Sequence, residues 1–111
     1  MLVIGVGLVS VSGCSADCRE SDGASQSSPD GRHSVEAVHK SCGGAAGAEE
    51  DLVYVVSGGD RTLGLRVHHQ VGPVVLTWID ADHVTVTLSE SAAVVESDSP
   101  VDGVELVAVD H

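Results

Sequence analysis

The chain contains few aromatic and few basic residues. Phenylalanine is absent, and Tyr54 and Trp78 are the only tyrosine and tryptophan among 111 residues. Five lysines and arginines stand against 17 aspartates and glutamates, which gives a formal net charge of −12. Such a chain repels phosphate backbones and anionic lipid headgroups, so we expect no nucleic-acid binding. Mutual repulsion keeps acidic surfaces of this kind soluble, and we expect a monomer.

Sequence motifs for catalysis are also missing. The chain has no G-x-S-x-G elbow for a hydrolase serine and no H-E-x-x-H pair for zinc. Cys42-Gly43-Gly44 lacks the lysine and the helix that a phosphate-binding loop requires. We therefore predict that the protein is not an enzyme, and we expect no catalytic residue, no cofactor and no bound metal.

No apolar run is long enough for a membrane-spanning helix, which needs about 20 residues. Residues 2–11 form an apolar stretch of ten, the length of a signal-peptide core, although no lysine or arginine precedes it. Val11-Ser12-Gly13-Cys14 follows and resembles the lipobox of prokaryotic lipoproteins, in which the cysteine thiol receives a diacylglycerol. We predict a signal peptide at residues 1–13 and a lipid on Cys14. The alternative is a buried first strand with an incidental cysteine.

The rest of the chain divides into a polar segment and one β-domain. Residues 14–27 are small and polar without apolar periodicity, so we expect a flexible tether that carries the anchor cysteine. Residues 28–111 begin with a Ser-Pro-Asp-Gly turn and are rich in valine. Their apolar runs predict strands at 33–41, 51–56, 62–69, 74–79, 83–88 and 104–109.

The fold class follows from these short strands. Asp80-Ala81-Asp82 joins two of the apolar runs, which predicts a hairpin between residues 74–79 and 83–88. No stretch shows a convincing helical period. We therefore predict an all-β domain whose small antiparallel sheet is curled into a sandwich or an open barrel.

The odd number of cysteines has a simple interpretation. If lipid consumes Cys14, the mature chain keeps Cys18 and Cys42, and an even remainder in an exported domain favours a disulfide. Such a bridge would contribute on the order of 3 kcal/mol to stability. Two free thiols and a metal or catalytic site are the alternatives. A metal would need two further ligands, and neither cysteine has a close-spaced partner of the zinc-ribbon type.

Several features occur in a characteristic order. They are the lipobox Cys14, Cys18 four residues later, Ser28-Pro29-Asp30-Gly31, Cys42-Gly43, the Trp78-Ile79 hairpin and the segments 92–96 and 101–106. Together they resemble a family of small bacterial lipoproteins known only as a domain of unknown function. Members usually follow Cys-Gly with an alanine and two threonines, whereas this chain has Gly44-Ala45-Ala46. The resemblance implies a membrane-anchored β-domain, a Cys18–Cys42 pair and a core position for Trp78, and it implies no activity.

Titratable residues cluster at two places. Asp80, Asp82 and His83 lie at the tip of the predicted hairpin, where aspartate is favoured because its side chain caps its own backbone. The acidic residues 49–51 are interpreted as charges at the edge of a sheet, which discourage pairing with another chain.

We predict a lipoprotein on the extracytoplasmic face of the cell membrane, held there by its lipid and acting as a non-catalytic module. Such a module binds another envelope protein or stabilises the envelope. The alternative is a small metal- or ligand-binding enzyme that uses His69 together with Asp80, Asp82 and His83. An inhibitor or immunity-type protein is a further alternative.

Overall fold

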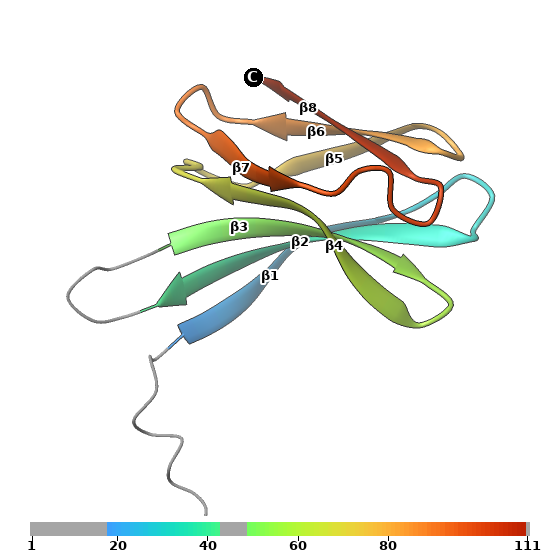
Figure 1. Ribbon diagram of the computed structural model, residues 1–111, viewed down its shortest axis with the longest axis horizontal. Coiled ribbons are helices and arrows are strands. Elements are labelled where there is room, and N and C mark those ends of the chain that lie inside the picture. The colour runs from blue at the N-terminus through green and yellow to red at the C-terminus, as the bar shows by residue number, and fades with distance from the viewer. Residues whose placement is uncertain (1–17, 43–48, 111) are drawn as a thin grey trace, which may run out of the picture.

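The computed structural model describes residues 18–42 and 49–110, which form an all-β sandwich (Figure 1). The eight strands are β1 (Cys18–Ser27), β2 (His33–Cys42), β3 (Glu49–Ser57), β4 (Asp60–His68), β5 (Val75–Asp80), β6 (His83–Leu88), β7 (Ala93–Ser97) and β8 (Glu105–Asp110). One sheet has five strands in the order β1-β2-β3-β4-β7, and the other has three in the order β5-β6-β8. The predicted fold class is therefore confirmed, as a sandwich and not as a barrel.

A valine-rich core lies between the two sheets. Side chains of a strand point alternately to opposite faces, so every second residue of a strand can face the other sheet. Valine suits this position because its branched side chain packs well on a pleated surface. The buried core consists of Val35, Ala37, Val53, Val55, Leu65, Val67, Val74, Leu76, Val84, Val86, Leu88, Val101, Val104 and Leu106. Two faces of branched aliphatic side chains thus form the core without phenylalanine.

A bulge in β4 brings the two sheets into close contact. The register between β3 and β4 shifts near the middle of the pair, and Gly64 is buried there. A Cβ atom at Gly64 would collide with the side chain of Leu106 in β8. Leu63, which strict alternation with Leu65 would direct into the core, is half-buried and is not part of the core cluster. Because of the bulge, Gly64 and not Leu63 faces the other sheet at this contact.

Three connections cross from one sheet to the other. Residues 69–74 join β4 to β5, residues 89–92 join β6 to β7, and residues 98–104 join β7 to β8. The chain reverses twice between β6 and β8, so these neighbours run parallel. The sequence predicted antiparallel pairing throughout, and it could not show that β7 would join the other sheet.

The predicted hairpin at residues 74–79 and 83–88 is confirmed. Strands β5 and β6 pair antiparallel from Val75 opposite Thr87 to Asp80 opposite His83. The other four predicted strands are also present, with bounds that differ by one to two residues at most ends.

The tether prediction for residues 14–27 is wrong from Cys18 onward. Residues 18–27 form β1, which pairs antiparallel with β2 at the edge of the five-stranded sheet. The predicted turn creates this hairpin, because the Ser28 backbone N–H donates to the His33 carbonyl at 2.8 Å and Gly31 adopts a φ of 75°. Only Ala24 among the residues of β1 is half-buried, and the others are exposed. The strand therefore needs no apolar face, which explains its polar composition.

Strand β7 was also missed by the sequence prediction. It lies at the opposite edge of the five-stranded sheet, and all five of its residues are exposed. Within the described residues, no helix has the length and apolar character needed to cross a membrane.

Candidate functional site

The Cys18–Cys42 disulfide is present, with an S–S distance of 2.05 Å. The two cysteines lie directly opposite each other in the β1–β2 register, at the first residue of β1 and the last residue of β2. The disulfide prediction is therefore confirmed against the free-thiol and metal alternatives. Cys14 and the signal-peptide segment at residues 1–13 lie outside the described residues, so the lipidation of Cys14 stays a prediction.

The acidic hairpin tip forms a hydrogen-bonded turn. Asp80 Oδ1 accepts a hydrogen bond from the Asp82 backbone N–H at 2.8 Å and lies 2.8 Å from His83 Nδ1. The hydrogen bond from His83 holds the pKa of Asp80 below its ordinary value, and the same contact raises the pKa of His83. His69 lies beyond the other end of β5, so it is not brought to the tip. Across residues 18–42 and 49–110, no three His, Cys, Asp or Glu side chains form a group that could hold a metal ion.

The acidic residues 49–51 are not edge charges, and this interpretation was wrong. They begin β3, which lies between β2 and β4 inside the five-stranded sheet. Their side chains are satisfied by cross-strand partners: Asp51 is buried and contacts His39, and Glu50 contacts Arg66 and His68. The apolar run that follows them fixes β3 in the sheet interior, so the neighbouring strands supply the counter-charges.

Arg66 is the centre of an ionic network on this sheet. Its guanidinium donates to Glu96 of β7 at 2.9 Å and to Glu50 of β3 at 2.8 Å. Burial opposes the ionisation of Glu50, but the hydrogen bonds from Arg66 and His68 outweigh it and hold the pKa of Glu50 below its ordinary value. The network ties the three neighbouring strands β3, β4 and β7 together.

The His39–Asp51 pair makes folding stability depend on pH. Asp51 Oδ1 accepts a hydrogen bond from His39 Nδ1 at 3.0 Å, and this bond raises the pKa of His39 above its ordinary 6.5. The stabilisation is therefore fully present below the unfolded pKa and is lost as the pH rises through the raised folded pKa. We expect urea unfolding to show that stability decreases as the pH rises above the ordinary histidine pKa of 6.5, where Asp and Glu side chains remain ionised.

Replacement of His39 isolates its contribution to this pH dependence. The His39→Gln variant is expected to lose part of the decrease, because glutamine carries no titrating proton. His83→Gln removes the other histidine whose pKa is raised, at the exposed hairpin, and we expect it to reduce the decrease as well. A decrease in His39→Gln as steep as in the unchanged protein would contradict the assignment.

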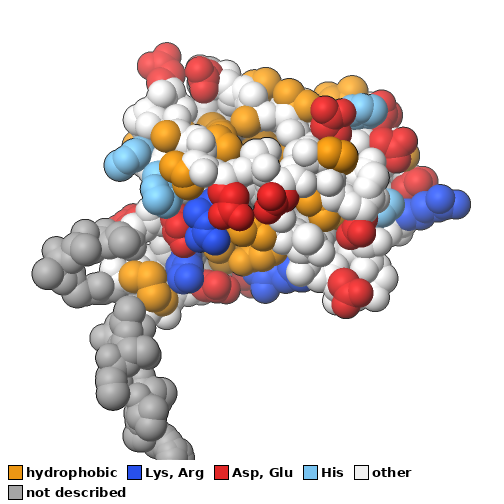
Figure 2. All heavy atoms as spheres, in the orientation of Figure 1, with side chains coloured by type: hydrophobic (Ala, Val, Ile, Leu, Met, Phe, Trp, Pro, Cys, Tyr) orange, Lys and Arg blue, Asp and Glu red, His pale blue; other side chains and the backbone are white. Residues whose placement is uncertain are grey.

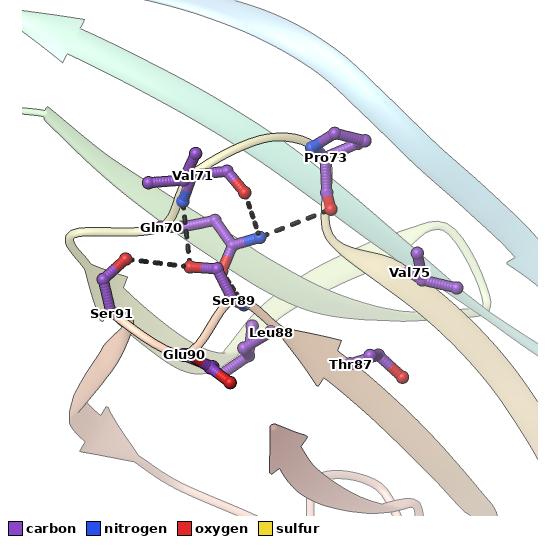
Figure 3. Close-up of a pocket in the computed structure, with 9 residues that line it drawn as sticks. All are labelled: Gln70, Val71, Pro73, Val75, Thr87, Leu88, Ser89, Glu90 and Ser91. Atoms are coloured by element: carbon purple, nitrogen blue, oxygen red, sulfur yellow. Dashed lines mark hydrogen bonds between the residues drawn. The ribbon is translucent and has the colours of Figure 1, made fainter. Parts of the chain in front are cut away.

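A pocket of about 610 Å³ lies between two of the sheet-to-sheet crossovers (Figure 3). Crossover 69–74 forms one wall and crossover 89–92 the other, while the ends of β5 and β6 form the floor. The lining residues are Gln70, Val71, Pro73, Val75, Thr87, Leu88, Ser89, Glu90 and Ser91. Most of the lining is apolar or uncharged, and Glu90 is its one charged residue.

Side-chain hydrogen bonds cross-link the two pocket walls. Gln70 Oε1 accepts from the Ser89 backbone N–H at 2.9 Å, and Gln70 Nε2 lies 3.2 to 3.4 Å from three carbonyl oxygens of its own loop. Ser89 Oγ in turn accepts from the Val71 backbone N–H at 3.0 Å, and Ser91 Oγ donates to the His69 carbonyl at 2.8 Å. Figure 3 shows Gln70 between the two loops. These bonds fix the pocket shape without a ligand.

The pocket carries groups that could bind a ligand. Ser89 Oγ accepts a hydrogen bond from the Val71 backbone N–H and contacts Ser91 Oγ at 3.2 Å, and among the described residues no histidine or carboxylate is hydrogen-bonded to it. An apolar floor with a single carboxylate at the rim can bury an apolar group and attract a positive charge.

Trp78 packs against the core, as the sequence predicted. Its ring is half-buried, and the indole Nε1–H donates to the Gln26 carbonyl of β1 at 3.0 Å. The bond connects β5 to the edge of the five-stranded sheet, and it leaves Trp78 with a structural role.

The sequence did not point to the pocket residues. Gly72-Pro73 and the serines at 89 and 91 indicate loops, but the meeting of two loops about 20 residues apart depends on the crossovers. Comparisons of the chain with models of protein families, with curated proteins and with solved structures found no match. The resemblance to small bacterial lipoproteins therefore stays a prediction.

Proposed function

We propose that the protein is a lipid-anchored module on the extracytoplasmic face of the cell membrane, where it binds another envelope protein and catalyses no reaction. The Cys18–Cys42 disulfide is the observation that carries the proposal. Disulfides persist in oxidising compartments outside the cytoplasm. The bond also accounts for two of the three cysteines, and the third, Cys14, follows the apolar stretch and has the lipobox order in front of it.

The short spacing between Cys14 and Cys18 supports an anchor close to the domain. Cys14 precedes Cys18 by four residues, and four residues span at most about 14 Å. A diacylglycerol carries two acyl chains, and each buried methylene contributes roughly 0.8 kcal/mol to membrane binding. The lipid would thus hold the disulfide end of the sandwich near the membrane surface.

A binding role is supported by what the described residues offer to a ligand. The pocket between the crossovers is fixed by hydrogen bonds, and its walls contain no activated nucleophile. The ionic groups elsewhere on the sandwich contact one another across strands. These features fit a module that presents a surface to a partner.

Replacing Cys14 with alanine tests the membrane anchor. We expect the protein to leave the membrane fraction of the cells, because the thiol that accepts the lipid is lost. Cell fractionation with immunoblotting measures the distribution, and intact-mass spectrometry of the unchanged protein detects the added lipid. The Cys18→Ala/Cys42→Ala double variant is the control, since it keeps Cys14 and should stay in the membrane fraction. An unchanged membrane-bound fraction in Cys14→Ala would refute the anchor.

A further inference from the structure

Exposed apolar side chains concentrate on the three-stranded sheet. Seven large apolar residues are exposed in the part of the chain that the structure describes, and five of them belong to β5, β8 or the crossover 69–74. These five are Val71, Val75, Ile79, Val107 and Val109, and their exposed fractions range from 38% to 72%. The larger sheet carries only the other two. Apolar side chains that gather on one exposed face are typical of interaction sites.

The residues form ordered rows across the outer face of the sheet. Thr87 of β6 lies between Val75 of β5 and Val109 of β8 in the strand register. Thr85 lies in the same way between Thr77 and Val107. The inner face carries the core residues of the same strands, so these rows point away from the core. We call the outward side chains of β5, β6 and β8 the docking face; it comprises Val75, Thr77, Ile79, Thr85, Thr87, Val107 and Val109.

The docking face continues into the pocket between the crossovers. Val75 and Thr87 belong to the outer rows and also line the pocket (Figure 3). A partner lying on the sheet could therefore insert one apolar side chain beside Val71 and Leu88. Interfaces draw most of their affinity from a few such buried anchors, and a fixed pocket lowers the entropy lost on binding.

Charge is unevenly distributed between the two sheets. All five lysines and arginines lie between Arg19 and Arg66, within β1 to β4 and their connections. The three-stranded sheet, its hairpin turn and the three crossovers contain no lysine or arginine and seven acidic residues: Asp80, Asp82, Glu90, Asp98, Asp102, Glu105 and Asp110. Figure 2 shows the blue side chains over the larger sheet and none over the three-stranded sheet at the top of the view.

This charge distribution favours a positively charged partner for the docking face. A second copy would bring two acidic, lysine-free and arginine-free surfaces together, and like charges at an interface oppose association. An anionic lipid surface is repelled for the same reason. A polypeptide with lysine or arginine beside apolar side chains would place its positive charges against Glu90 at the pocket and against Glu105 at the opposite end of the apolar rows, where Glu105 lies 3.4 Å from His83.

We infer that the docking face and its pocket bind a basic partner polypeptide, through a segment in which lysine or arginine alternates with apolar residues. This inference rests on the binding role in the proposed function and names the partner chemistry; it does not depend on the lipid. An extended segment fits because its side chains alternate between two faces: the apolar residues can lie on the Val–Thr rows, and the long, flexible stems of lysine and arginine can bend from the other face toward the acidic residues at the rim.

Binding of a synthetic peptide to the full mature chain tests the inference. The probe is a peptide of alternating lysine and valine, and the comparison peptides alternate glutamate with valine and lysine with serine. We expect only the first peptide to bind with a measurable Kd in calorimetry. We also expect its affinity to fall by about tenfold or more as salt rises from about 50 mM to about 500 mM, because the contributing charges are exposed.

Two matched variants locate the binding surface. Val75→Lys adds a positive charge to the docking face at a valine that is 49% exposed. Val95→Lys adds the same charge to β7 of the other sheet at a valine that is 50% exposed. We expect Val75→Lys to weaken peptide binding by about tenfold or more, which corresponds to 1.4 kcal/mol, and Val95→Lys to leave the Kd within about twofold. Val107→Lys repeats the test on β8, and circular dichroism confirms that each variant is folded.

The outcomes separate this inference from the membrane anchor. Equal weakening by Val75→Lys and Val95→Lys, or equal binding of all three peptides, would overturn the docking face as the site. Self-association that Val75→Lys abolishes and Val95→Lys does not would identify a second copy as the occupant and would also overturn the inference. Loss of the protein from membranes in Cys14→Ala with unchanged peptide binding supports both proposals, while an unchanged membrane fraction overturns the anchor alone.

Discussion

Replacing both Cys18 and Cys42 with alanine is expected to lower the free energy of unfolding by about 3 kcal/mol. The bond closes a loop with a sequence separation of 24, and its loss returns that conformational freedom to the unfolded chain. Small domains have a net stability of only about 5–15 kcal/mol, so the loss is a large share of the total. Urea unfolding measures the difference, and the melting temperature should fall by on the order of 15 °C.

The effect should be largest in β1. This strand lies at the edge of the sheet and buries almost none of its own side chains, so beyond the backbone hydrogen bonds to β2 it is attached mainly by the disulfide and by the hydrogen bond from Trp78 to Gln26. Hydrogen exchange in the double variant should therefore be faster in β1 than in β3. The matched control is Ser27→Ala/Ser34→Ala, a cross-strand pair at the other end of the same two strands. A loss below about 1 kcal/mol in the cysteine variant would contradict the prediction.

Replacing Gly64 with valine is expected to cost about 1–3 kcal/mol of stability, because the added side chain overpacks the contact between the sheets. The new Cβ would overlap the side chain of Leu106. Gly64 is not among the glycines with a positive φ, so the cost comes from the contact between sheets and not from the backbone conformation.

A double-mutant cycle separates this contact from other effects of the substitution. In a Leu106→Ala background the colliding side chain is gone, and Gly64→Val should then cost much less than in the unchanged protein. Equal costs in the two backgrounds, measured by urea unfolding, would show that Leu106 is not the cause.

The sequence predicted the strands whose side chains alternate or cluster, and it failed where a strand has no apolar face. The core strands β2 to β6 carry enough valine and leucine to be recognised. Strands β1 and β7 lie at the two edges of the larger sheet, and their residues are almost all exposed. Their pairing is set by neighbours: the turn at residues 28–31 folds β1 onto β2, and β7 pairs with β4.

Some features of the candidate site could be predicted from neighbouring residues, whereas others depend on contacts between distant parts of the chain. The disulfide followed from the cysteine count, and the hairpin tip followed from the local turn chemistry of Asp80. The docking face required the parallel pairing of β6 with β8, which places Val107 beside Thr85. The residue pattern of a single strand does not indicate which other strand it pairs with.

The position of the disulfide has a mechanical consequence for an anchored domain. A pull on the lipid would reach the sandwich at Cys18, the first residue of the edge strand β1. If only hydrogen bonds held this strand, they would break one after another and β1 would separate from β2. The covalent bond instead passes the load to Cys42 on β2, whose other edge is paired along its length with β3. Forced unfolding is governed by the barrier that the load must cross. Tension from the membrane would therefore act on the interior of the sheet and spare β1.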